Sequence, residues 1–328
     1  MNFYRNLILA TLILAFGVVS LGAYVRLSDA GLGCPDWPGC YGKITPKHAA
    51  EHIEAELALS PDGPVSHAKA WKEMVHRYFA GTLGMMVLAI AVLAWKLRRE
   101  TVGGPALPTV LLSLIIFQAL LGMWTVTLLL KPVIVTAHLL GGMATMSLLL
   151  WLWLRERGQA SQAYYARVDH LRPAALLALV LVVVQVALGG WVSTNYAALA
   201  CSDFPLCQGQ WVPQGMDFEH AFTLRRELGE TATGELLTMA SLTAIHWVHR
   251  VMALIVFVYV GWLAIRLLRT PGYICFGMAV GGLLLVQVTL GISNVLFSLP
   301  LGLAVAHNAG AAFLLASVLW LNHRVRRS

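Results

Sequence analysis

The sequence is an internal duplication. The segment Leu21–Pro46, LGAYVRLSDAGLGCPDWPGCYGKITP, aligns without a gap with Leu188–Pro213, LGGWVSTNYAALACSDFPLCQGQWVP. Further along each copy, WKEMVHR ends at Arg77 and AIHWVHR ends at Arg250. A glutamine then precedes a histidine by twenty residues in both copies. A duplicated unit predicts two similar structures related by pseudo-symmetry, so a site in one copy implies a counterpart in the other.

Long apolar runs limit what each copy can fold into. Hydrophobic residues make up 58% of the chain, charged residues only 12%, and the mean hydropathy is +0.71. Backbone groups in lipid must bond within their own segment, and the runs are too long for barrel strands. We therefore predict an all-α integral membrane protein whose eight transmembrane helices form two pseudo-symmetric four-helix bundles, residues 1–160 and 161–328. The predicted spans, each about twenty residues long, are roughly 7–26, 72–95, 108–130, 133–154, 174–193, 240–265, 274–297 and 301–321.

Basic residues predict the orientation of these spans. The connections after the second, fourth, sixth and eighth spans are rich in Lys and Arg, so the positive-inside rule places them and both termini in the cytoplasm. The net charge of +7 thus reflects topology, and no soluble basic patch favours a nucleic-acid partner. About six residues precede the first span, too few for a transit peptide, which favours a bacterial plasma membrane. The basic residues are Arg5, Lys96, Arg98, Arg99, Arg155, Arg157, Arg167, Arg172, Arg266, Arg269, Arg324, Arg326 and Arg327.

The two long loops on the opposite side each contain a cysteine pair. An oxidising compartment permits disulfides there, and we predict Cys34–Cys40 and Cys201–Cys207. Two roles stay open: each bridge staples its loop, or at least one is a redox-active dithiol. Zinc binding is a weak alternative because C-x5-C is wider than the usual zinc spacing. Residues 48–60 are expected to form an external amphipathic helix, and Cys275 is expected to be an inert core thiol.

Four histidines within the predicted spans carry the main functional signal. Ionisable groups are costly in a membrane, so a role and a partner are expected for each. Two imidazoles on facing helices, repeated in the second copy, are typical of bis-histidine ligation of haem iron. The residues are His76, His138, His249 and His307. One helical turn later stand small residues that would leave room for a flat macrocycle, namely Ala80, Gly142, Ala253 and Ala311.

The residues next to these histidines differ between the copies in one respect. Arg77 and Arg250 follow a histidine in each copy and are suited to a haem propionate, although interfacial snorkelling is an equal alternative. Glu73 in the first copy corresponds to His246 in the second. Glu73 and its histidine have the spacing of a di-iron motif, but the other spans lack the further glutamates which that site needs. A carboxylate thus stands beside one site and not beside the other. This difference indicates proton chemistry in the first copy and a permanent cofactor in the second.

Together these motifs resemble bacterial haem A synthases of the cysteine-bearing type. The resemblance rests on the duplicated eight-span layout, GLGCPDWPGCYG, EMVHRYFAGTLG, AHLLGG around His138, HWVHR ending at Arg250 and AHNAGA around His307, and covers nearly the whole chain. It implies an oxidoreductase that converts the C8 methyl group of haem O, through an alcohol, to the formyl group of haem A for cytochrome oxidase.

The resemblance also implies a role for each site residue. His249 and His307 would be the axial ligands of a haem b cofactor, whereas His76 and His138 would bind the iron of the substrate haem O. Glu73 would be the essential catalytic carboxylate. Besides haem O and the lipid bilayer, the expected partners are the farnesyltransferase that makes haem O and further copies of this chain.

Two other classes of function remain as alternatives. The same four histidines would serve a di-haem cytochrome b that transfers electrons across the membrane without acting on haem O. The external cysteine pairs would serve a thiol oxidoreductase, but that function leaves the four intramembrane histidines without a role. The pigments extracted from the protein separate the first alternative from the synthase, because a carrier yields haem b alone.

Overall fold

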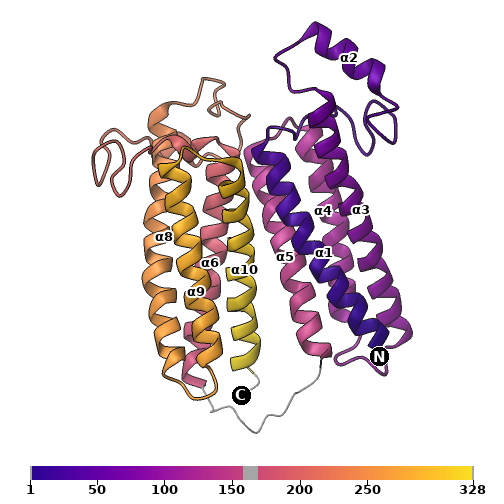
Figure 1. The fold of residues 1–328 in the computed structure, drawn as a ribbon, viewed down its shortest axis with the longest axis vertical. Helices are drawn as coiled ribbons and strands as arrows, with labels where there is room; N and C mark the ends of the chain where they lie inside the picture. The colour runs from indigo at the N-terminus through magenta and orange to yellow at the C-terminus, as the bar shows by residue number, and fades with distance from the viewer. Residues whose placement is uncertain (1, 158–168, 327–328) are drawn as a thin grey trace. The chain divides into compact units, whose positions relative to one another are not determined.

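The computed structural model describes residues 2–157 and 169–326, and it confirms the all-helical prediction. Within these ranges eight helices are long and apolar enough to cross a membrane, and no β-strand is assigned (Figure 1). The chain is a multi-pass membrane protein. The eight helices are α1 (Asn2–Leu27), α3 (His67–Lys96), α4 (Ala106–Thr127), α5 (Pro132–Glu156), α6 (Arg172–Thr194), α8 (Met239–Leu268), α9 (Ile274–Leu296) and α10 (Leu301–Val325).

Helices α3 and α8 begin earlier than the hydropathy pattern predicts. The side chain of Ser66 accepts a hydrogen bond from the Lys69 N–H, and that of Thr238 accepts one from the Ser241 N–H. Such N-caps satisfy amide groups that lack partners in the first helical turn, so the helices extend into polar sequence. Both helices have 30 residues. His76 and His249 accordingly lie nine and ten residues after the first residue of their helices.

The chain divides into two compact units. One comprises residues 1–146 with 224–236, and the other comprises residues 147–223 with 237–328. In the first, α3 packs against α1 and α4. In the second, α8 packs against α6 and α9, and α10 packs against the same two helices (Figure 1). The expected boundary at residues 160/161 lies outside the described residues, as do Arg167 and Arg327.

Short elements lie in the loops that connect the long helices. The expected external helix is α2 (Ala50–Leu59), which lies beyond the N-terminal end of α3 in Figure 1. The second long loop contains the 3₁₀ turn η3 (Ala197–Leu199) and α7 (Phe218–Ala221). Cys275 is exposed in the first turn of α9, so the expectation of a core thiol was wrong.

A buried amide joins two helices of the second unit. The Asn322 side chain on α10 donates hydrogen bonds from Nδ2 to the carbonyl oxygens of Ala175 on α6 (2.7 Å) and Val318 on its own helix (2.9 Å). Water does not compete for this hydrogen bond in an apolar interior. The bond to Ala175 therefore contributes to the packing of α10 against α6.

We expect Asn322→Leu to lower the free energy of unfolding by about 1 kcal/mol, because it removes the α6–α10 hydrogen bond while keeping the branched shape of the side chain. The measurement is the thermal unfolding midpoint of the purified protein in detergent. Ser317→Ala is the matched control, since the Ser317 hydroxyl bonds only to Leu314 within α10. Equal midpoints for Asn322→Leu, the control and the wild type would contradict the expectation.

Candidate functional site

Each cysteine pair forms a disulfide that closes a short loop, as predicted. We call Cys34–Cys40 the first disulfide loop and Cys201–Cys207 the second. An aspartate organises each turn: Asp36 accepts the N–H groups of Tyr41 and Gly42 (both 2.6 Å), and Asp203 accepts those of the equivalent Gln208 and Gly209 (both 2.8 Å). Hydrogen bonds from Gly209 and Gln208 hold the pKa of Asp203 below its usual value.

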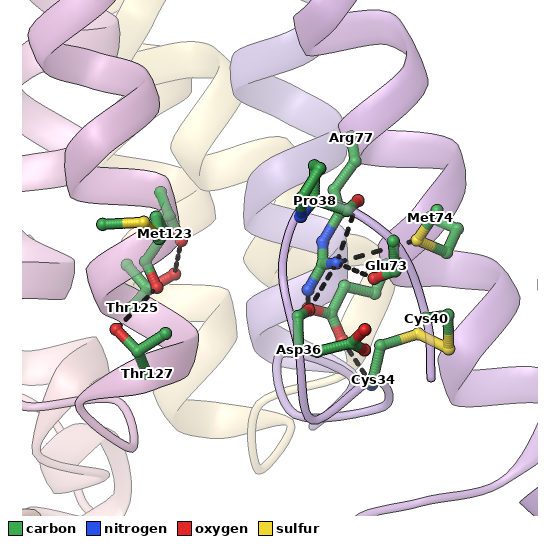
Figure 2. A network of polar contacts seen from close by, with 12 residues as sticks. Cys34, Asp36, Pro38, Cys40, Glu73, Met74, Arg77, Met123, Thr125 and Thr127 are labelled. Atoms are coloured by element: carbon green, nitrogen blue, oxygen red, sulfur yellow. Dashed lines mark hydrogen bonds and ion pairs between the residues drawn. A yellow bond between two sulfur atoms is a disulfide. The ribbon is translucent and has the colours of Figure 1, made fainter. Parts of the chain in front are cut away.

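An arginine on α3 holds the first disulfide loop (Figure 2). Nη1 of Arg77 donates to the carbonyl oxygens of Asp36 (2.8 Å), Pro38 (3.3 Å) and Gly39, and Nη2 donates to Oε1 of Glu73. The other carboxylate oxygen of Glu73 accepts the N–H of Cys34 at 3.0 Å. Glu73 is only 4% exposed. The predicted catalytic carboxylate is therefore fixed between a guanidinium and a disulfide loop.

The second repeat builds the same network around a histidine. Arg250 donates to the carbonyl oxygens of Cys201 (2.7 Å), Asp203 (2.8 Å) and Leu206 (2.8 Å). Its Nε lies 3.2 Å from Nε2 of His246, and the Cys201 N–H lies 3.3 Å from Nδ1 of the same ring. A carboxylate accepts two such donors, but a neutral imidazole accepts only one. The second network therefore lacks both the anion and the full acceptor set of the first.

The two arginines thus have contacts that sequence reasoning did not anticipate. Their guanidinium groups reach the carbonyl oxygens of the disulfide loops, which are tertiary contacts without a local sequence signal. A contact of Arg77 or Arg250 with a propionate stays a prediction.

The four intramembrane histidines form two pairs, one in each repeat. His76 on α3 and His138 on α5 are close enough for their charges to interact, and so are His249 on α8 and His307 on α10. His138 and His307 each lie six residues after the first residue of their helix. The described residues contain no group of three or more His, Cys, Asp or Glu that could bind a metal ion. Paired imidazoles suit a porphyrin iron, which leaves two axial positions for the protein.

A glycine on a neighbouring helix faces each of the four imidazoles. A Cβ atom added to any of these glycines would lie 3.0–3.2 Å from Cε1 of the facing ring, closer than ordinary van der Waals contact. The pairs are Gly22 with His76, Gly122 with His138, Gly189 with His249, and Gly291 with His307. Sequence reasoning missed these glycines, although a recurring L-G dipeptide on α1, α4, α6 and α9 was available as a signal.

Polar atoms around the histidines are buried without partners. Nδ1 of His76, His138 and His307 has no hydrogen-bond partner among the described residues. Together with the four glycines, these imidazoles form a cradle that fits a planar group with two axial positions. That the small residues one turn after each histidine leave room for such a group stays a prediction. Gly142, one of these residues, faces Val19 and Gln118.

Comparison with known proteins gives one consistent family. Residues 5–319 match the COX15-CtaA model, described as cytochrome oxidase assembly protein. A Heme A synthase of Shewanella oneidensis is 44% identical over 95% of this chain and 94% of its own length. A Heme A synthase of Rhizorhabdus wittichii is 27% identical over 98% of this chain and 94% of its own length. Heme A synthase COX15 of Arabidopsis thaliana is 28% identical over 95% of this chain and 72% of its own length.

We expect Gly291→Val to displace the His307 imidazole, because the added side chain occupies space now filled by the ring. The measurement is the amount of haem that copurifies with the protein and its low-spin absorption spectrum. Gly282→Val is the matched control on the same helix, since no atom lies within 4 Å of a Cβ at that position. Equal haem content and identical spectra in both variants would show that the glycine contact is not needed.

Proposed function

The chain belongs to the COX15-CtaA family and is a haem A synthase, and from that premise we propose that it oxidises the C8 methyl group of haem O to a formyl group for cytochrome oxidase. The observation that carries this proposal is the difference between two otherwise equivalent networks. Glu73 lies three residues before His76, and His246 lies three residues before His249. Of the two networks described, the first thus has a carboxylate at this position and the second has an imidazole.

We assign the two histidine pairs to two haems on that basis. His76 and His138 would bind the substrate haem O next to Glu73, and His249 and His307 would hold a haem b cofactor. The glycine contacts at all four rings, and the unpaired Nδ1 atoms of His76, His138 and His307, support the binding of a haem at each pair. A haem b held there would supply one-electron transfer.

The chain's own residues then account for orientation and proton transfer. Converting a methyl to a formyl group removes C–H hydrogens, so a proton acceptor is needed near the substrate. Glu73 would be that acceptor. Arg77 favours the ionised carboxylate through the ion pair, and the Cys34 N–H fixes the second oxygen. His76, one turn along α3, would orient the substrate ring relative to this carboxylate.

Environment and partners follow from the same proposal. The protein would lie in a bacterial plasma membrane with both termini in the cytoplasm, and the disulfide loops would face the oxidising side. Haem O would come from the farnesyltransferase that makes it, either by release into the bilayer or through a complex with this protein. Assembly with further copies of the chain remains part of the proposal.

We expect His249→Ala and His307→Ala to lose the tightly bound haem b, because each removes an axial ligand. His76→Ala and His138→Ala should keep haem b and abolish formation of haem A. The measurement is the composition of extracted haems, together with the spectrum of the purified protein. Loss of haem b only in the first-repeat variants would mean that the assignments are reversed. A wild-type protein that contains haem b and never haem O or haem A would instead indicate an electron carrier.

We expect Glu73→Gln to reduce conversion of haem O to haem A by about 10²-fold or more, since a positioned proton acceptor typically contributes that much. Glutamine keeps the size of the side chain and can still bond to Cys34. The measurement is haem A formed per molecule of protein with equal haem loading. His246→Gln, at the equivalent position of the second repeat, is the matched control and should reduce turnover far less. Unchanged turnover in Glu73→Gln would remove the carboxylate from the chemistry.

A further inference from the structure

The two repeats differ in charge at the end of the helices that carries the disulfide loops. Arg26, near the end of α1, aligns with Ser193, and Lys72, near the start of α3, aligns with Ile245. In the proposed orientation this end faces away from the cytoplasm, where the positive-inside rule predicts few basic residues. Membrane topology therefore does not account for these two cations, which indicates a role specific to the first repeat.

Arg26 lies on the face of α1 that meets the His76 ring. A Cβ atom added to Gly22 on that face would lie 3.0 Å from Cε1 of His76. Arg26 follows Gly22 by four residues, so it lies on the same side of the helix, about 6 Å further toward the first disulfide loop. Its side chain is only 13% exposed. The first site thus has a largely buried guanidinium one helical turn from the glycine that contacts its ring.

Lys72 has the corresponding position on α3. It precedes His76 by four residues, so it lies one turn nearer the start of the helix on the histidine's own face. Its Nζ lies 5.2 Å from the centre of the Tyr24 ring on α1. Because α1 and α3 pack against each other, the two cations come from neighbouring helices at the same end of the first unit.

The present contacts of both cations are compatible with binding an anion. Nη1 of Arg26 lies 3.6 Å from Oδ1 of Asp29, whose side chain is 62% exposed, and water screens an ion pair with such a partner. A ring contact leaves the charge of Lys72 uncompensated. Arg77 differs from both, since it already donates to Glu73 and to carbonyl oxygens of the first disulfide loop.

The chemistry of a haem supplies suitable anions. Two propionate groups extend from one edge of the porphyrin, and a carboxylate that leaves water needs a cation or N–H donors beside it. We propose that Arg26 and Lys72 bind the propionates of haem O and so orient the ring in the first site with its propionate edge toward the first disulfide loop. This inference rests on the proposed function, in which the first repeat binds haem O.

The test compares haem O with its dimethyl ester, in which both propionates are uncharged. Protein purified with haem b is titrated with each compound, and the Kd is taken from the change in absorption. We expect the wild type to bind haem O more than 10-fold more tightly than the ester, since hydrogen bonds to charged groups contribute that much.

Two variants introduce the residues of the second repeat. Arg26→Ser should weaken the binding of haem O about 10-fold and leave that of the ester unchanged. Lys72→Ile should have the same effect to a smaller extent, because an ammonium group lacks the bidentate geometry of a guanidinium. Arg26→Lys should keep part of the preference for haem O, because it retains the charge.

A control variant separates a specific contact from general attraction of an anion. Lys47→Ser removes an exposed basic residue from the same external loop and should leave both Kd values near those of the wild type. Haem b content should be equal in all variants, since every change lies in the first repeat. Equal weakening of haem O and of the ester in Arg26→Ser would overturn the inference, because Arg26 would then support the fold and not bind a carboxylate.

The remaining outcomes distinguish this inference from the proposed function. A wild-type protein that binds no haem O in addition to its haem b would overturn the function itself. A wild-type protein that binds haem O, but whose preference over the ester is unchanged in Arg26→Ser and Lys72→Ile, would overturn only the role of these two residues. A weakening in Lys47→Ser as large as in Arg26→Ser would also overturn that role.

Discussion

A largely buried guanidinium near the start of α3, and its counterpart on α8, determine how each site is built. Arginine carries five N–H donors and cannot lose its charge, so it must find acceptors when it leaves water. The first disulfide loop supplies three carbonyl oxygens to Arg77, and the second supplies three to Arg250. Because one of the four intramembrane histidines immediately precedes each arginine, this requirement also fixes where His76 and His249 lie relative to the loop.

Duplication gives the two sites one framework, and two substitutions on either side of one histidine distinguish them. On α3 and α8, the position three residues before that histidine is Glu73 or His246. On α1 and α6, the residue four positions before the glycine that faces the ring is Val18 or Gln185, and the Gln185 amide contacts the His249 ring. The first repeat therefore has a carboxylate three residues before its histidine, which suits proton transfer. The second has a neutral imidazole there, which offers only one acceptor to the two donors around it.

The sequence alone predicted the helices, the disulfides and the histidine pairs. Long apolar runs are visible locally, and the repeat is visible when the two halves of the chain are aligned with each other. It placed the start of α3 five residues late, since a cap at Ser66 extends the helix into polar sequence. The arginine contacts depend on tertiary structure and could not be predicted. Gly22 and its counterparts were missed because glycine is common in membrane helices, so its contact with an imidazole has no distinct pattern.

The network around Glu73 also changes how the first cysteine pair should be understood. The Cys34 N–H is a direct hydrogen-bond donor to the Glu73 carboxylate, so the disulfide loop is part of that side chain's environment. Opening the bridge would free the donor and alter the carboxylate even if the bundle stayed folded. A fall in activity without a fall in stability would therefore not identify a redox role for Cys34–Cys40. Only chemistry at the sulfur atoms themselves, such as a mixed disulfide with a partner, would distinguish a dithiol from a positioning loop.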